Sequence, residues 1–193
     1  MTVIEKYGPT ALKGLDLKGS AITVPSTCTG CEMGKSMQKP FLRSTKTMDQ
    51  ILQIVHSDLV GPMRDRSIQG SLYFTTFIDN HLHHAVVYCI RSKDQFVVTL
   101  CKFLAWANNQ TSKKLCVLHS DREGKYIAAS VKTILDERGI KYHLTMPGLP
   151  QQNGKAERFN CTIVDKAMAI LHASGLSQGF WKYVISAAVH IYN

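Results

Sequence analysis

The order of apolar segments constrains the fold of this chain more than any other feature of its sequence. Three segments with strand patterns, 51–59, 71–78 and 85–90, follow one another with only short turns between them. Beyond residue 92 the pattern alternates between helix and strand. Consecutive strands joined by short turns pair antiparallel, whereas strands joined through a helix pair in parallel. The sequence therefore predicts an α/β fold, a mixed five-stranded sheet with helices on both faces.

Beyond residue 92, the spacing of the apolar residues distinguishes predicted helices from predicted strands. Apolar positions three and four residues apart are typical of a helix facing a core, and short continuous apolar runs are typical of buried strands. The predicted helices span 93–109, 131–138, 155–173 and 180–193, and the predicted further strands span 115–118 and 141–144.

Residues 1–47 differ in composition from the rest, with many Gly, Lys, Ser and Thr and little periodicity. We therefore divide the chain into an N-terminal segment, 1–47, and a folded core, 48–193. Apolar runs of about five residues fall far below the roughly 20 that cross a bilayer, so we expect no membrane span. The first residues lack a signal-peptide pattern, so we expect the six cysteines to be thiols or metal ligands rather than disulfides.

Positive charge is concentrated toward the end of the chain. The formal net charge is +9, and residues 110–193 carry eleven Lys and Arg against six Asp and Glu. Such an excess favours a polyanionic partner, most often nucleic acid. Composition alone fits a generic basic protein equally well, so the partner has to be inferred from motifs.

Three carboxylates occupy positions that the predicted elements bring to one edge of the sheet. Asp58 and Asp121 each end a predicted strand within the tripeptide His-Ser-Asp, and Glu157 lies in the first turn of a predicted helix. Convergent carboxylates repel one another unless a cation neutralises them, and oxygen ligands favour Mg²⁺ or Mn²⁺ over zinc. Two such metals about 4 Å apart can drive phosphodiester chemistry. Any one of these acids taken alone is best interpreted as a solvated surface carboxylate. The three together predict a metal-dependent site.

Five sequence blocks surround these acids in a fixed order. They are HSDLVGP at Asp58, FIDN at Asp79, HSDREGKY at Asp121, PQQNGKAERFN at Glu157, and FWKYVISAAVHIYN near the end. Between Asp121 and Glu157 lie 35 residues. Over about residues 48–193, the blocks together resemble the integrase core of copia-type LTR retrotransposons, and the spacing is that of the Asp, Asp-35-Glu integrases.

The resemblance implies an RNase H-like fold in which Asp58, Asp121 and Glu157 bind Mg²⁺ or Mn²⁺. It implies an enzyme that trims the 3′ ends of element cDNA and joins them to target DNA by transesterification, with water and then a DNA 3′-hydroxyl as nucleophile. Members of this family act as homo-oligomers, and the resemblance implies a nuclear location after a stage in cytoplasmic virus-like particles. No targeting signal is visible in this chain, and the chain is interpreted as a fragment of a larger Pol polyprotein.

Some positions depart from the family pattern. Glu123 and Lys125 follow Asp121 where the family has a small residue and an acid, and Lys155 stands where a small apolar residue is common. These departures keep open a second interpretation, a catalytically inactive retroelement relic that binds nucleic acid. A third, an RNase H-type nuclease, shares the fold but is disfavoured by the 35-residue spacing and the NGKAER block.

Basic and amide side chains flank Glu157. They fall on one stripe of the predicted helix and in the loop before it, where they can meet DNA phosphates and base edges. A solvated helix face is the alternative. The predicted DNA contacts are Gln152, Asn153, Lys155, Arg158 and Lys166, with Gln151 and Thr162 beside them.

Cys28 and Cys31 form a C-x₂-C pair. A structural zinc site needs four ligands. The pair matches the second half of the His-His-Cys-Cys finger that precedes the core in copia-type elements, but the first histidine here is His56. We therefore interpret residues 1–47 as a finger remnant and linker, and expect zinc binding only together with ligands missing from this chain.

We predict structural roles for the other cysteines and for a histidine cluster. Apolar surroundings predict buried thiols, and a hairpin position predicts an exposed turn. The predicted core thiols are Cys89, Cys101, Cys116 and Cys161, and the predicted exposed turn holds His81, His83 and His84.

Overall fold

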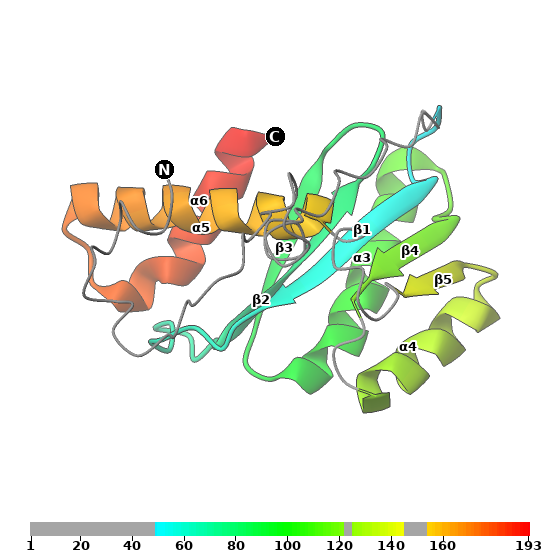
Figure 1. Ribbon diagram of the computed structural model, residues 1–193, viewed down its shortest axis with the longest axis horizontal. Coiled ribbons are helices and arrows are strands. Elements are labelled where there is room, and N and C mark those ends of the chain that lie inside the picture. Colours follow the sequence, from blue (N-terminus) through cyan, green and yellow to red (C-terminus); the bar gives the residue numbers. More distant parts are fainter. Residues whose placement is uncertain (1–48, 122–124, 145–153) are drawn as a thin grey trace, which may run out of the picture. The chain divides into compact units, whose positions relative to one another are not determined.

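A computed structural model describes residues 49–121, 125–144 and 154–193. In these segments five strands form one sheet in the order β3-β2-β1-β4-β5 (Figure 1). The strands are β1 Ile54–Val60, β2 Tyr73–Asp79, β3 Ala85–Ile90, β4 Val117–Ser120 and β5 Lys141–Leu144.

The strand directions are those that the connections predict. β1 pairs antiparallel with β2, and β2 pairs antiparallel with β3. β4 joins β1 in parallel after a helical crossover, and β5 joins β4 in parallel after another. The predicted mixed five-stranded sheet is therefore confirmed.

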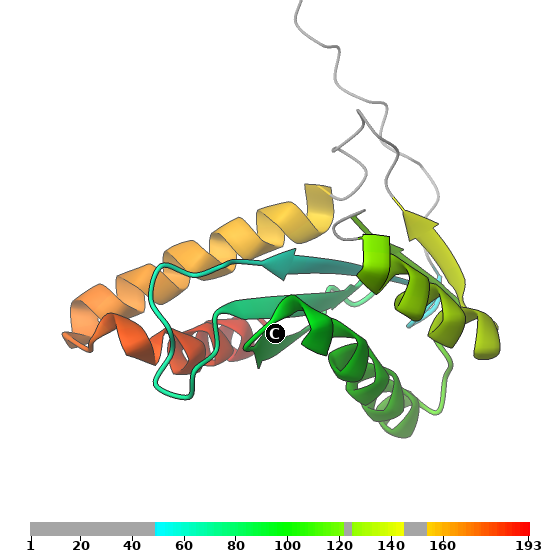
Figure 2. The same cartoon turned by 90° about the horizontal axis from the view of Figure 1, so that it is seen from below.

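The helices lie on both faces of this sheet, as predicted. Figure 2 shows α5 on one side of the strands and α3 on the other. The four α-helices of the described segments are α3 Phe96–Thr111, α4 Lys125–Glu137, α5 Gly154–Ser174 and α6 Trp181–Tyr192, and short 3-10 turns at Lys93–Gln95 and Gln178–Phe180 lead into α3 and α6.

The face under α3 and α4 holds one hydrophobic cluster. Phe77 of β2 is fully buried there, and its ring stacks on Phe103 of α3 with centroids 4.4 Å apart and planes 6° from parallel. Leu118 of β4 and Leu135 of α4 complete the same cluster. Burying side chains of this size stabilises the fold by roughly 1.5–3 kcal/mol each.

The face under α5 and α6 holds a second cluster. Phe74 and Ile78 of β2 pack there against Ile163 of α5 and Trp181 of α6. The alternation along β2 explains the division, because neighbouring residues of a strand point to opposite faces. The apolar stripe of α5 is therefore fixed on the sheet, and its other side is left for solvent or a partner.

Element boundaries are where the sequence prediction was least accurate. β1 ends at Val60, so Asp58 lies inside the strand, because Leu59 and Val60 continue the ladder with β2. α4 begins at Lys125, six residues before the predicted start, since the segment contains good helix formers ahead of its apolar face.

Two thiols are more exposed than predicted. Cys116 and Cys161 are exposed, so the prediction of core thiols was wrong for them, whereas Cys89 and Cys101 are partly buried. Cys116 precedes β4 and Cys161 lies away from the buried stripe of α5. The histidine turn of the β2–β3 connection is exposed, as predicted.

None of the helices within 49–121, 125–144 and 154–193 has the length and apolarity of a membrane span. The predicted finger remnant and linker, 1–47, with Cys28 and Cys31, lies outside the described residues, as do Gln151, Gln152 and Asn153.

Candidate active site

The repeated tripeptide His-Ser-Asp places two of the predicted acids side by side. In the parallel pairing of β1 with β4, His56 lies opposite His119 and Ser57 lies opposite Ser120. Asp58 and the residue after β4, Asp121, therefore occupy equivalent positions. Because alternate residues share a face, both belong to the side of the sheet that α5 covers.

Asp58 is a half-buried carboxylate held by two hydrogen bonds. Its Oδ1 accepts from the backbone N–H of Leu59 over 2.9 Å, and its Oδ2 accepts from Nδ2 of Asn160 over 2.8 Å. Burial raises the pKa of Asp58, and these two hydrogen bonds oppose the rise. A desolvated carboxylate in this state gains from a nearby cation.

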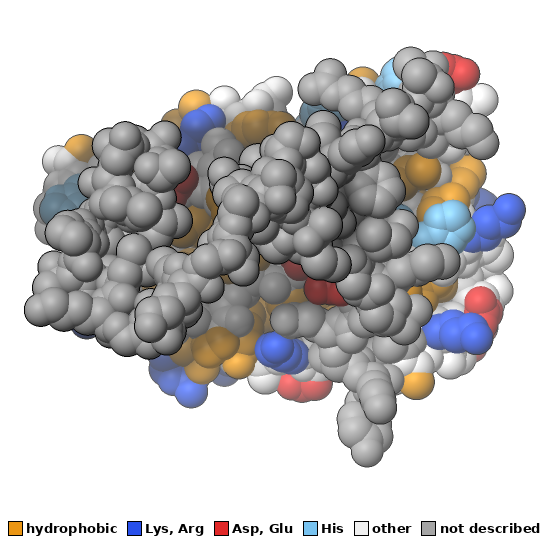
Figure 3. All heavy atoms as spheres, in the orientation of Figure 1, with side chains coloured by type: hydrophobic (Ala, Val, Ile, Leu, Met, Phe, Trp, Pro, Cys, Tyr) orange, Lys and Arg blue, Asp and Glu red, His pale blue; other side chains and the backbone are white. Residues whose placement is uncertain are grey.

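The other two predicted acids act on Asp58 through their charge. Glu157 and then Asp121 raise the pKa of Asp58 by electrostatic repulsion. Glu157 lies in the first turn of α5 and is exposed. Figure 3 shows acidic side chains near the middle of the face that carries α5, and both acidic and basic side chains toward its rim. The three acids thus belong to one electrostatic neighbourhood.

The described side chains around Asp58 do not form a complete metal-binding site. Across the part of the chain that the structure describes, no group of three His, Cys, Asp or Glu side chains is arranged to hold a metal ion. The donor chemistry fits a hard cation, because all three groups offer carboxylate oxygens and their mutual repulsion would fall when a cation binds. Metal binding by Asp58, Asp121 and Glu157 stays a prediction.

Asn160 is a site residue that the motif argument missed. It lies one turn after Glu157 on the buried side of α5 and is only 4% exposed. Its Oδ1 accepts from the hydroxyl of Thr76 over 3.0 Å, which turns its amide so that Nδ2 donates to Asp58. The sequence feature that could have identified Asn160 is its position, three residues after Glu157 on the side of the helix that faces the sheet.

A row of histidines continues from the acids across the same face. The His56 and His119 rings lie 5.2 Å apart, and His119 lies 6.4 Å from His143 of β5. Burial, and then His119 and Lys155, lower the pKa of His56 to about 4, while Asn80 and Asp79 oppose this. Burial and then His143 lower the pKa of His119 as well. His56 is therefore neutral at neutral pH.

The predicted DNA-contacting residues separate into two groups. Arg158 and Lys166 are exposed on α5, and Nζ of Lys166 lies 5.6 Å from the centre of the Tyr192 ring. Lys155 is half-buried and donates from Nζ to the carbonyl and side-chain oxygens of Asn80, over 3.0 and 2.8 Å. Lys155 therefore differs from the other two cations, because its ammonium group is hydrogen-bonded to the protein.

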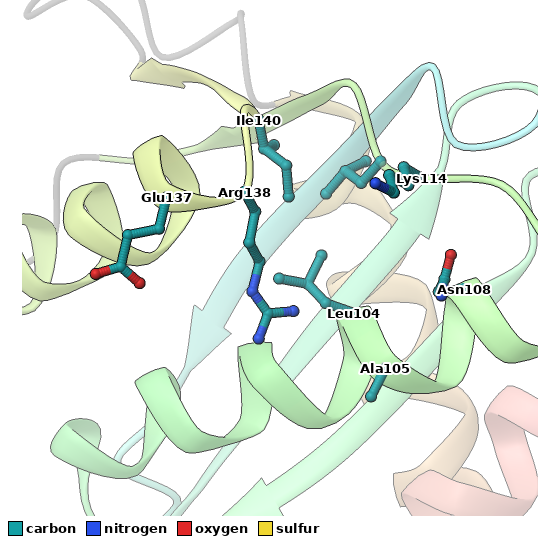
Figure 4. A pocket seen from close by; sticks show the side chains of 8 residues that line it. Leu104, Ala105, Asn108, Lys114, Glu137, Arg138 and Ile140 are labelled. Carbon is teal, nitrogen blue, oxygen red and sulfur yellow. The ribbon is translucent and has the colours of Figure 1, made fainter.

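The opposite side of the molecule has a concave site that contains none of the predicted residues. A cavity of about 370 Å³ lies between α3 and the end of α4. In Figure 4, Arg138 reaches across it toward Leu104, while Glu137 points away. The full lining is Leu104, Ala105, Asn108, Lys114, Leu115, Glu137, Arg138 and Ile140.

Comparison with known sequences shows which proteins this chain resembles. It is 35% identical, over 98% of its length, to a retrovirus-related Pol polyprotein from transposon TNT 1-94 of Nicotiana tabacum. Its homologues are copia-type retrovirus-related Pol polyproteins. A second one, from transposon RE2 of Arabidopsis thaliana, is 28% identical over 86% of the chain. The chain spans only 15% and 11% of these two polyproteins.

The fold also has a counterpart among solved structures. A chain of the simian T-cell lymphotropic virus intasome, determined in complex with PP2A regulatory subunit B56 gamma, superposes with a TM-score of 0.63. The match covers 84% of this chain and 56% of that one, at 12% sequence identity. The likeness confirms the expected RNase H-like fold. No protein-family model matches the chain.

Proposed function

We propose that this chain is the catalytic part of a retrotransposon integrase. In this proposal it is a divalent-metal-dependent polynucleotidyl transferase that processes the 3′ ends of element cDNA and transfers them into target DNA. Its partners are then DNA ends, target DNA and further copies of the chain. The observation that carries the proposal is the parallel pairing of β1 with β4, which puts Asp58 and Asp121 at equivalent positions, while Asn160 of the helix that carries Glu157 hydrogen-bonds to Asp58.

The residues would divide the work as follows. Hydrogen bonds from Leu59 and Asn160 hold the Asp58 side chain in one orientation. The carboxylate therefore loses little conformational freedom when it binds a cation. Glu157 is carried by a rigid helix whose buried face is fixed on the sheet. Mg²⁺ or Mn²⁺ bound by these acids would activate the attacking oxygen and stabilise the leaving oxygen of a phosphodiester.

DNA would approach along the solvent side of α5. Arg158 lies next to Glu157 and is exposed, and Lys166 lies two turns further along. Lys and Arg contacts to phosphates bind DNA of any sequence and weaken as salt rises. This arrangement would bring a DNA end to the acids with little dependence on its sequence.

A DNA-end joining assay on the full chain tests the proposal. We expect Mn²⁺-dependent nicking or end joining on a duplex carrying element-like ends, and loss of this activity in Asp121→Asn. Asp136→Asn changes an exposed acid of α4 and serves as the matched control, for which we expect full activity. Absence of nicking and joining in Mn²⁺, with the finger and C-terminal regions of a relative supplied in trans, would contradict the proposal.

A second candidate is a nucleic-acid-binding relic without catalysis. The observation that favours it is that no three-ligand metal group is found in the described segments. It predicts that Asp58→Ala leaves DNA affinity unchanged and that Mn²⁺ does not raise the thermal midpoint of the protein. Calorimetric titration with Mn²⁺ separates the two candidates, because only the enzyme requires the acids to bind the ion.

A further inference from the structure

The structure places the ammonium group of Lys155, a predicted DNA contact, in hydrogen bonds to the protein itself. It lies in the first turn of α5, two residues before Glu157. Its Nζ donates to the backbone carbonyl of Asn80 over 3.0 Å and to Oδ1 of Asn80 over 2.8 Å. Two hydrogen bonds from a charged donor to one residue make a strong and directional link.

Asn80, the partner of Lys155, is itself anchored. It directly follows β2, and its backbone N–H donates to the carbonyl of Ile54 at the start of β1 over 2.9 Å. The side chain of Asn80 also acts on His56 of β1, because it opposes the lowering of the His56 pKa by burial. Lys155 therefore attaches α5 to a point that is already tied to the central strand.

The turn that contains Asn80 is held from inside by Asp79. The Asp79 carboxylate is 6% exposed and accepts backbone N–H groups from Leu52 over 2.8 Å, His81 over 3.0 Å and Leu82 over 2.6 Å. Burial lowers the pKa of Lys155, and the negative charge of Asp79 opposes this shift. The ammonium group thus lies against a turn whose backbone the Asp79 carboxylate holds.

We propose that Lys155 is a positioning residue that ties the first turn of α5, and with it Glu157, to the β2–β3 turn, and that it does not contact DNA. The apolar side of α5 holds the body of the helix on the sheet. Its first turn is held less firmly, because the terminal turn of a helix frays most readily. Lys155 supplies the tie at that end. This role rests on the proposed function, because it matters for catalysis only if Glu157 takes part in the reaction.

The test compares single Lys and Arg substitutions in the full chain. Lys155→Met removes the hydrogen bonds while keeping the length of the side chain, Lys155→Arg keeps a charged donor, and Asn80→Ala removes the side-chain acceptor. Arg158→Met is the comparison for a DNA contact, and Lys132→Met, at an exposed position of α4, is the neutral control. Three quantities are measured: amide hydrogen exchange in 155–160, the salt dependence of DNA affinity, and Mn²⁺-dependent turnover.

We expect Lys155→Met and Asn80→Ala to speed exchange of the amides of residues 158–160, whose helical acceptors are carbonyls of the first turn of α5, by about tenfold or more, with Lys155→Arg near the wild type. We expect the slope of log affinity against log salt to stay unchanged in Lys155→Met and to fall by about one in Arg158→Met. At saturating DNA, Lys155→Met should lower kcat by about tenfold with KM for DNA unchanged, because a small displacement of a catalytic group costs rate rather than binding.

A loss of about one unit of salt slope in Lys155→Met, equal to that of Arg158→Met, would overturn the proposal in favour of a DNA contact. Unchanged exchange of the amides of residues 158–160 would overturn it too. If the wild-type chain shows no turnover, the proposed function fails, whereas the exchange and salt measurements still decide the role of Lys155.

Discussion

Asn160 donates a hydrogen bond from Nδ2 to Oδ2 of Asp58 over 2.8 Å, and this bond joins the last-acid helix to the central strand of the sheet. The bond is partly buried, and the amide that makes it is held by a buried hydrogen bond from the hydroxyl of Thr76. The orientation of Asp58 therefore depends on two residues that carry no charge and that no acid motif would select.

Asn160→Asp replaces this donor with a carboxylate at the same place. We expect the free energy of unfolding at pH 7, without divalent metal, to fall by about 2–3 kcal/mol, because two carboxylates then face each other in a partly buried position. Urea unfolding followed by circular dichroism measures the change. Thr76→Val is the matched control, since it removes one neutral hydrogen bond and should cost only about 1 kcal/mol. Equal stability of Asn160→Asp and the wild type would contradict the geometry.

Glu157→Gln tests whether the acids share one neighbourhood. The negative charge of Glu157 raises the pKa of Asp58, so its removal should lower that pKa toward the ordinary value. Glu157 is exposed, and we expect its substitution to leave folding intact. Carboxyl-carbon NMR titration of metal-free protein reports the pKa directly. Asp165→Asn, an exposed acid further along α5, should leave the pKa of Asp58 as it is, and an equal effect of both substitutions would argue against a specific contact.

The neutral histidines should make the stability depend on pH. The pKa of His56 is about 4 in the folded state against 6.5 in the unfolded chain, so the unfolded chain binds more protons between these values. The contribution of His56 is therefore present above pH 6.5 and is lost as pH falls toward 4. The full shift corresponds to about 3 kcal/mol at roughly 1.4 kcal/mol per pH unit.

Urea unfolding at pH 7 and pH 5 checks this dependence. We expect a lower midpoint at pH 5 for the wild type, and a smaller difference between the two pH values in His56→Gln. The comparison uses differences within each variant, so a constant cost of the substitution cancels. His172→Gln alters an exposed histidine at the end of α5 and should retain the full dependence.

Asp79→Ala removes the carboxylate that closes the β2–β3 turn. Three backbone N–H groups, of Leu52, His81 and Leu82, lose their acceptor, so we expect a loss of about 3 kcal/mol in the free energy of unfolding. Thermal unfolding measures the loss. Asp136→Ala, at an exposed position, should change stability by less than about 0.5 kcal/mol. A loss no larger than that of the control would show that the turn does not depend on this carboxylate.

The sequence by itself determined the sheet. Short turns between the first three strands and helical crossovers before the last two leave little choice of strand direction, and the observed directions follow from them. Asp58 and Asp121 could be placed together because both stand at position three of His-Ser-Asp on strands that prove to be parallel neighbours. Boundaries were less predictable, since the extension of β1 to Val60 depends on its ladder with β2.

The partners of the site residues were decided by the tertiary structure alone. The sequence stripe of α5 placed Lys155 with Arg158, yet Lys155 turns to Asn80, which is 75 residues away in the chain. The link from Thr76 through Asn160 to Asp58 likewise joins residues 84 and 102 positions apart. Periodicity tells which side of an element is buried, because burial repeats with the geometry of that element. It does not tell which polar groups meet there, because each hydrogen bond requires two distant segments to bring one donor and one acceptor within about 3 Å.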